Sequence, residues 1–253
     1  MHWDYALILL VFATVVPLLG RRRIRRLMQA SSTTKTDRLI LYASTIAFQW
    51  IAVALILWRT RAHALSFADL GIAVPKPGLA AIAALTLSGL IVVNQLVALR
   101  RLREHPDSPA HGILPHLALK VFPQDGVERI AFAALVSTVA ICEELIYRGF
   151  AQRVFQDWAA GGSRLAFAMA AGIVGSVVIF SLAHLYQGKR GLIATFVAGM
   201  LFSIVRAFTG SLLPASVAHF VADIMAGFLA PRQLQLGREA AAAEPVPDGT
   251  VRH

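Results

Sequence analysis

The sequence predicts an all-α protein, a polytopic transmembrane helical bundle of about seven spans, with eight as the alternative count. Of its 253 residues, 57% are hydrophobic and only 15% are charged, whereas soluble domains carry roughly 25% charged residues. The apolar residues form long runs, close to the ~20 residues that cross the hydrocarbon core of a bilayer. The polar segments between these runs are short.

The candidate spans follow one another through most of the chain. They cover residues 5–20, 39–58, 78–99, 130–147, 165–186, 192–208 and 212–230. Each must be helical in a bilayer, because a helix satisfies its backbone polar groups internally. The fourth span is expected to continue as one helix to residue 158.

Two polar regions complete the domain organisation. The loop 100–128 is interrupted by prolines and is expected to hold a short interfacial helix at 114–122. Residues 231–253 are rich in alanine, proline and charge, so we expect a disordered tail there. The chain would then be a single transmembrane domain, residues 1–230, followed by this tail.

The net charge of +10 indicates topology and contact with lipid headgroups rather than nucleic acid. Basic clusters at residues 21–26, 100–103 and 189–190 follow the first, third and fifth spans. Alternating spans put all three clusters on one side, which the positive-inside rule makes cytoplasmic. The N-terminus is then outside and the C-terminus cytoplasmic. The single cysteine, Cys142, excludes an intramolecular disulfide framework and a cysteine-rich metal site.

Ionisable side chains are costly inside a bilayer and mark functional sites by default. We expect only three acidic residues and two histidines within or at the ends of the spans, with one arginine a turn beyond the first acidic pair. These candidate site residues are Glu143, Glu144, Arg148, His184, His219 and Asp223.

The spacing of the first group predicts two different roles for adjacent glutamates. Glu144 and Arg148 are separated by four positions, so they share a helix face and can form an ion pair. Glu143 points about 100° away from Glu144 on a helix. One glutamate is therefore expected to face the chemistry while the other pairs with Arg148.

The other candidates repeat the four-residue spacing. His219 and Asp223 share one helix face, and Phe180 and His184 share another. Glu143 and His184 lie nearly equal numbers of residues from the connection between the fourth and fifth spans, so an antiparallel hairpin places them at one depth. These helices could meet around one cavity.

Other readings remain open on these residues alone. An ion pair or a single histidine inside a membrane can be structural, although four such groups at matching depth are hard to explain by packing. Intramembrane Glu, His and Asp also build the relays of proton-coupled transporters. A non-catalytic membrane protein for immunity or scaffolding is the third class. Gln49, Asn94 and Gln95 are expected to form interhelical hydrogen bonds.

Three short motifs resemble a known family. Residues 143–149 (Glu-Glu-Leu-Ile-Tyr-Arg-Gly) resemble the E-E-x-x-x-R signature of the CAAX protease and bacteriocin-processing (CPBP, or abortive-infection) family, which includes the type II prenyl endopeptidases. Residues 180–184 (Phe-Ser-Leu-Ala-His) resemble its F-x-x-x-H motif. Residues 219–223 (His-Phe-Val-Ala-Asp) resemble its H-x-x-x-N or H-x-x-x-D motif. The resemblance covers residues 127–230.

The resemblance implies an intramembrane endopeptidase that hydrolyses peptide bonds with an activated water. Glu143 would be the general base, and His184 would help to hold the water. His219 and Asp223 would stabilise the oxyanion, and His219 would also supply a proton. The prenyl endopeptidases carry asparagine where this chain has Asp223, and an ionised aspartate cannot donate a hydrogen bond to an oxyanion.

The supporting residues, cofactors and partners follow from the same resemblance. Glu144, Arg148 and Phe180 would support the site. No obligatory metal is expected; a zinc ion, if bound, would be held by Glu143, His184, His219 and Asp223. The substrate would be a peptide or a membrane-protein segment. The family suggests a bacterial plasma membrane. The depth of the candidate residues in their spans predicts an active site toward the cytoplasmic side. The sequence does not determine the oligomeric state.

Overall fold

The computed structural model describes residues 2–161 and 164–243, and every regular element in these ranges is a helix. Seven helical stretches are long and apolar enough to cross a membrane. They cover 3–29, 35–62, 77–104, 126–159, 165–183, 185–209 and 213–243. The predicted all-α transmembrane bundle of seven spans is therefore confirmed, and the protein is an integral membrane protein.

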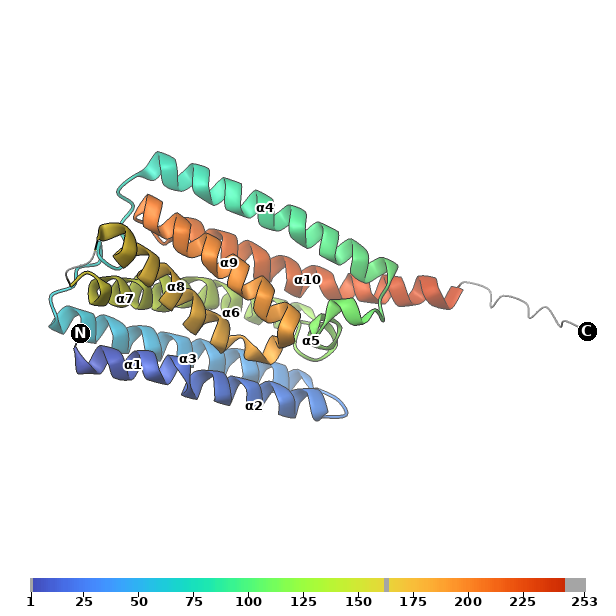
Figure 1. Ribbon diagram of the computed structural model, residues 1–253. Coiled ribbons are helices and arrows are strands. Elements are labelled where there is room, and N and C mark those ends of the chain that lie inside the picture. The colour runs from blue at the N-terminus through green and yellow to red at the C-terminus, as the bar shows by residue number, and fades with distance from the viewer. Residues whose placement is uncertain (1, 162–163, 244–253) are drawn as a thin grey trace, which may run out of the picture.

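The helices alternate in direction between two ends of the bundle (Figure 1). At one end lie the N-terminus and the segment after α3 (Lys35–Ala62). At the other lie the α2–α3 connection, the segment after α4 (Pro77–Glu104) and the end of α10 (Leu213–Ala243). The basic residues 21–26, 100–103 and 189–190 all belong to this second end, which we call the arginine end.

The first span consists of two helices, α1 (Trp3–Ala13) and α2 (Val15–Gln29), rather than one. They meet at Thr14, whose φ of −125° and ψ of −61° leave the helical region. Pro17 lies in the first turn of α2, where its ring conflicts with the carbonyl of residue 13 and it donates no hydrogen bond. The Thr14 hydroxyl donates to the Leu10 carbonyl at 2.7 Å.

The fourth span continues through the predicted distance but changes its helical type. It consists of α6 (Gly126–Glu144), the π-helical segment η2 (Leu145–Ala151) and α7 (Gln152–Ala159). The π segment begins immediately after the two glutamates, and all seven of its residues are buried. Short π segments inside α-helices are frequent at functional sites, since the extra residue per turn rotates the side chains that follow.

The loop at the arginine end contains the expected interfacial helix, α5 (Leu114–Lys120), preceded by the short η1 (Pro109–His111). Lys120 Nζ donates to the carbonyls of Met28 and Ala30 at 2.6 Å each, which satisfies the C-terminal end of α2. This loop is therefore tied to the first span.

The expectation of only three acidic residues within the spans is wrong. Asp4 in α1 and Glu128 in α6 are also buried in helices. Each has an arginine partner: Arg59 Nε lies 2.7 Å from Asp4 Oδ2, and Arg38 Nη2 lies 2.8 Å from Glu128 Oε1. The basic partners are distant in sequence, so no local pattern announces these structural ion pairs.

The prediction of disorder from residue 231 is wrong for residues 231–243, which continue α10. Pro231 removes one backbone hydrogen bond, but the following turns pack against the bundle. Leu234 is buried, and Gly237 approaches α4 so closely that a Cβ there would lie 2.3 Å from the Arg103 carbonyl oxygen. The rest of the predicted tail, 244–253, lies outside the described residues.

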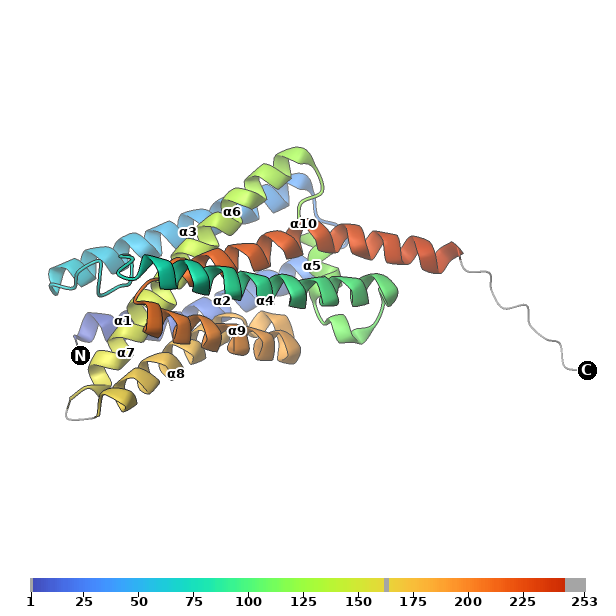
Figure 2. The same cartoon turned by 90° about the horizontal axis from the view of Figure 1, so that it is seen from above.

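The last three spans form the other side of the bundle. They are α8 (Leu165–Ala183), α9 (Gly188–Thr209) and α10, with the short η3 (Leu185–Gln187) between α8 and α9. Helix α10 packs along α4, α8 packs on α7 and α9, and α6 packs on α3. Seen from above, α10 runs through the middle of the molecule between α3 and α9 (Figure 2).

Candidate active site

A cavity of about 470 Å³ lies inside the bundle and extends toward the arginine end. Its lining residues come from α2, α3, α4, α5, α6, α9 and α10 and from the short segments η1 and η3. All four predicted catalytic residues line it: Glu143, His184, His219 and Asp223. Residues that are far apart in the sequence therefore face one space, as the motif spacing predicted.

Glu143 lines this cavity, and its two carboxylate oxygens differ in their partners. Its Oε1 accepts a hydrogen bond from Gln49 Nε2 of α3 at 3.0 Å. Its Oε2 is buried and has no hydrogen-bond partner among the described residues. A buried acceptor without a protein partner is the position where a water or substrate group would bind.

Glu144 points into the packed interior instead. Its Oε1 accepts from Arg148 Nη1 at 2.9 Å and from His219 Nδ1 at 2.9 Å. The side chains of Glu144 and Arg148 are both 0% exposed. The ion pair expected from their spacing is present, and the contact with His219 adds a third member from α10.

Arg148 is held by aromatic rings as well as by Glu144. Its guanidinium lies 3.9 Å from the ring centroid of Phe180 and 5.4 Å from that of Phe202. Gly199 of α9 makes room for it, since a Cβ there would lie 3.1 Å from both Arg148 Nη2 and the Phe180 ring. Phe180 therefore acts as a packing partner of the arginine.

Phe180 also orients His184, four residues later. The Phe180 carbonyl accepts a hydrogen bond from His184 Nδ1 at 2.8 Å, and the two rings lie 4.6 Å apart. A carbonyl can only accept, so Nδ1 carries the hydrogen. In the neutral ring, Nε2 is then an acceptor, available to a water in the cavity.

His219 lies between two carboxylates. Its Nδ1 donates to Glu144, and its Nε2 lies 3.6 Å from Asp223 Oδ2, which is longer than a hydrogen bond. The His219 side chain is 9% exposed, whereas that of Asp223 is 41% exposed. Asp223 therefore extends into the cavity beyond the histidine.

The donor groups do not converge as metal ligands. Among the described residues, no group of three or more His, Cys, Asp and Glu side chains is placed to hold a metal ion. Each site histidine uses Nδ1 in a hydrogen bond, to the Phe180 carbonyl and to Glu144, which leaves Nε2 as the nitrogen that could ligate a metal. The four residues named for a zinc ion share the cavity, but within the described ranges no three of their side chains are close enough together to form a ligand set.

Comparison with known proteins finds one family in this part of the chain. Residues 126–225, less than half of the chain, match the family model described as type II CAAX prenyl endopeptidase Rce1-like. This part of the chain is therefore similar to the CAAX protease family. The match includes every predicted site residue, from Glu143 to Asp223. Neither the curated proteins nor the solved structures contain a significant match to the chain.

The matched family consists of proteases, which supports a hydrolase, and the seven apolar helices place it in the membrane. Its model matches α6 to the middle of α10, close to the region 127–230 that the three motifs indicated. The cavity, however, is completed by helices outside the match, including α3 and α4.

The sequence predicted an interhelical hydrogen bond for Gln49 but no contact with the candidate site. This hydrogen bond exists, but the acceptor is the cavity-facing Glu143. Tyr186 and Gln187 of η3 also line the cavity. Only their closeness to His184 in the sequence could have indicated them.

Proposed function

We propose that this protein is an intramembrane endopeptidase that hydrolyses peptide bonds inside the cavity. The observation that carries the proposal is the unpartnered Oε2 of Glu143, in a cavity also lined by His184, His219 and Asp223. The carboxylate with its free acceptor oxygen provides a base. The nearby imidazoles provide a water-binding group and, when one is protonated, a cation in the same cavity. The match to a protease family supports the same chemistry.

In the proposed first step, water binds between Glu143 and His184. The Nδ1–H of His184 is used by the Phe180 carbonyl, so Nε2 accepts a hydrogen bond from that water. Glu143 takes a proton as the water oxygen attacks the scissile carbonyl carbon. The hydrogen bond from Gln49 fixes the other oxygen of Glu143 and directs Oε2 toward the water.

In the second step, a charged intermediate must be stabilised and the amine must leave. His219 in its imidazolium form donates from Nε2 to the oxyanion, while Glu144 and Asp223 offset its charge. The C–N bond then breaks, and the leaving amine takes the proton held by Glu143. Asp223 cannot donate while ionised, so its part is to offset the charge of the His219 imidazolium, whose ring is oriented by the hydrogen bond to Glu144.

We propose this reaction without an obligatory metal. The proposal rests on the separation of the donor groups, of which no three are arranged as a ligand set within the described residues. A zinc-dependent enzyme would lose activity to a chelator and regain it with zinc.

The substrate would be a peptide or a membrane-protein segment that enters from the arginine end. We place this end in the cytoplasm by the positive-inside rule. Apolar side chains of α5 and α6, including Leu117 and Leu135, line the cavity near it, so an extended apolar segment fits its lining.

The test compares purified wild type with Glu143→Gln and His184→Ala in detergent, using a quenched library of peptides and membrane-segment substrates. The wild type should cleave the substrate. The cleavage rate of each variant should be about a thousandfold lower, since general acid–base groups contribute on that order. Glu104→Gln, which changes an exposed glutamate paired with Arg100, is the matched control and should cleave normally. A parallel series contains a chelator.

Two outcomes would contradict the proposal. Substantial cleavage by Glu143→Gln would show that Glu143 is not the general base. Absence of cleavage by the wild type, together with proton-coupled uptake in liposomes, would support the transporter instead. If the wild type cleaves the substrate but loses this activity with the chelator, the protein is a protease, and the metal-free mechanism is wrong.

A further inference from the structure

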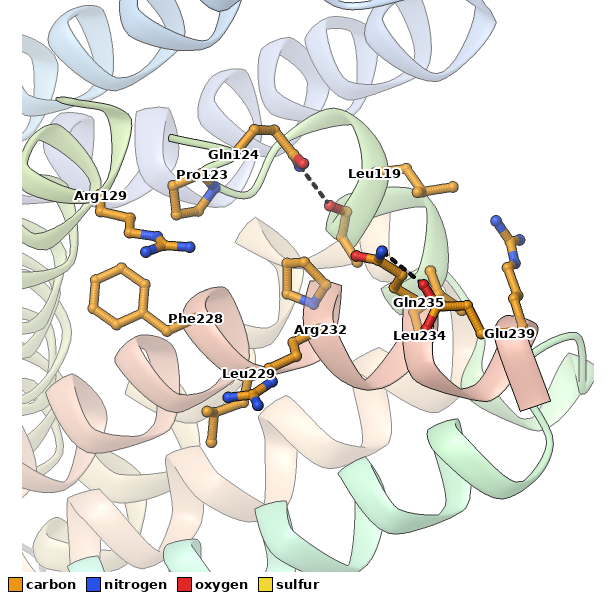
Figure 3. A pocket seen from close by; sticks show the side chains of 13 residues that line it. Leu119, Pro123, Gln124, Arg129, Phe228, Leu229, Arg232, Leu234, Gln235 and Glu239 are labelled. Atoms are coloured by element: carbon orange, nitrogen blue, oxygen red, sulfur yellow. Dashed lines mark hydrogen bonds between the residues drawn. The ribbon is translucent and has the colours of Figure 1, made fainter. Parts of the chain in front are cut away.

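A second pocket, larger than the cavity at the candidate active site, lies elsewhere in the protein. It has a volume of about 690 Å³ and lies between α5, the beginning of α6 and the last turns of α10 (Figure 3). None of its lining residues lines the cavity that contains Glu143. This pocket is therefore a space separate from the candidate active site.

Arginines dominate the charge of this pocket. Arg129 of α6 and Arg232 and Arg238 of α10 line it, with Glu239 as the only acidic lining residue. The Glu239 carboxylate accepts from Gln235 Nε2 at 2.9 Å, which Figure 3 marks. The pocket therefore carries an excess of positive charge.

Two of these arginines have no partner in the part of the chain that the structure describes. Arg238 Nη2 lies 3.4 Å from Asp107, but Arg129 and Arg232 make neither an ion pair nor a side-chain hydrogen bond there. Two other arginines near this end, Arg38 and Arg100, are instead paired with Glu128 and Glu104. Two free guanidinium groups on facing helices are thus available to an anion.

The exposed surface around the pocket places it at the boundary of the hydrocarbon. Val127 and Ile130, which flank Arg129 in the sequence, are 57% and 76% exposed, and Leu119 at the pocket is 50% exposed. Such side chains face lipid in a membrane protein. The arginines therefore lie where acyl chains end and headgroups begin, at the level of α5.

We propose that this pocket binds an anionic phospholipid of the bilayer. Arg129 and Arg232 contact the phosphate, since a guanidinium forms paired, charge-assisted hydrogen bonds with its oxygens. One acyl chain lies along the apolar wall of Phe228, Leu229 and Leu119. Basic pockets between transmembrane helices on the cytoplasmic side suit this class of ligand.

The test measures lipid binding to the purified full-length protein by native mass spectrometry. Phosphatidylglycerol and phosphatidylcholine with the same acyl chains are titrated separately. The wild type should prefer phosphatidylglycerol, and the double variant Arg129→Gln/Arg232→Gln should bind it about tenfold more weakly, with phosphatidylcholine binding unchanged. Arg129→Lys/Arg232→Lys keeps the charge and should retain part of the preference.

A matched control removes two arginines from the same end of the molecule. Arg21 and Arg25 are exposed on α2 and do not line the pocket. Arg21→Gln/Arg25→Gln should keep the wild-type preference. An equal loss in this control, or an undiminished preference in Arg129→Gln/Arg232→Gln, would overturn the proposal. Competition by glycerol phosphate, which lacks acyl chains, would also overturn it in favour of a soluble phosphoester site.

Discussion

At the scale of single residues, the two adjacent glutamates are distinguished by their partners. Glu144 is fully buried and shares one oxygen between Arg148 and His219, so its charge is compensated. Removing one member of such a buried pair costs about 3–5 kcal/mol, because the other charge remains without a partner. Each glutamate has one oxygen without a partner among the described residues, but only Glu143 lines the cavity, and we therefore propose it as the reactive member.

Gln49→Leu tests whether the amide orients the proposed base. The substitution removes the hydrogen bond to Glu143 Oε1 without changing the glutamate. We expect kcat to fall about tenfold to a hundredfold, since a hydrogen bond to a charged group contributes about 1.5–3 kcal/mol. The KM for the peptide should change little. Steady-state kinetics on the cleaved substrate measure both.

Gln152→Leu is the matched control for this experiment. Gln152 is a buried glutamine that donates to the Ser203 carbonyl at 3.1 Å, and it does not line the cavity. The change should lower thermal stability while kcat stays near the wild-type value. Equal losses of kcat in both variants would mean that Gln49 acts only through stability.

At the scale of elements, small residues and one loop determine how the helices meet. Gly172 of α8 lies against α7 so closely that a Cβ there would be 2.7 Å from the Gln152 carbonyl oxygen. The loop between α3 and α4 is also tied down: Arg153 Nη1 lies 2.7 Å from Asp69 Oδ1, and Arg206 Nη2 donates to the Asp69 carbonyl at 2.9 Å. These contacts fix the positions of α7, α8 and α9 relative to one another and to the α3–α4 loop.

Gly172→Ala should destabilise the α7–α8 contact. The added methyl meets a backbone oxygen, which cannot rotate away, so we expect a loss of about 1–3 kcal/mol. Thermal unfolding in detergent measures the change. Gly89→Ala on α4, where a Cβ would meet nothing within 4 Å, should be neutral or slightly stabilising. Equal behaviour of the two variants would contradict the close packing.

The loop contact predicts a dependence of stability on pH. The Ser66 hydroxyl and backbone N–H donate to Asp69, and with the Arg153 guanidinium they hold the pKa of Asp69 below its usual range. A carboxyl whose pKa is lower in the folded chain stabilises it above the unfolded pKa of about 3.9. This contribution is lost as the pH falls through the folded pKa.

Asp69→Asn therefore should be less stable than the wild type at neutral pH, and the difference should shrink as the pH falls below about 4. Unfolding midpoints across a pH series in detergent measure this difference. Asp107→Asn, at a carboxylate that is 80% exposed, serves as the control. A difference that stays constant from neutral to acidic pH would show that Asp69 does not act through its charge.

At the scale of the whole molecule, seven spans bring both halves of the chain to one cavity. The basic clusters after the first, third and fifth spans lie at the end toward which the cavity extends. We propose that this end is cytoplasmic, which also places the anionic lipid pocket in the inner leaflet.

Cysteine accessibility tests this orientation. The native Cys142 is buried, so single cysteines can be introduced at exposed positions of the two ends, as Ser32→Cys and Ala68→Cys. A membrane-impermeant maleimide should label Ser32→Cys only in inside-out vesicles and Ala68→Cys only in right-side-out vesicles. The reverse pattern would place the arginine end outside.

The features that depend on local order could be predicted from the amino-acid sequence. Apolar runs of sufficient length predicted seven spans, and four-residue spacings predicted the Glu144–Arg148 pair and the facing of His184 and Phe180. These predictions succeeded because helix length and helix face follow from residues within a turn or a span of one another.

The groups that complete the site became clear from the packing of the helices. Gln49 contacts Glu143, which is 94 residues away in the sequence, and Glu144 contacts His219, which is 75 residues away. The π segment after Glu144 and the helical extension past Pro231 likewise depend on packing against other helices. Local periodicity gives each helix a polar face, but the rotation and tilt that make two faces meet come from the assembled bundle.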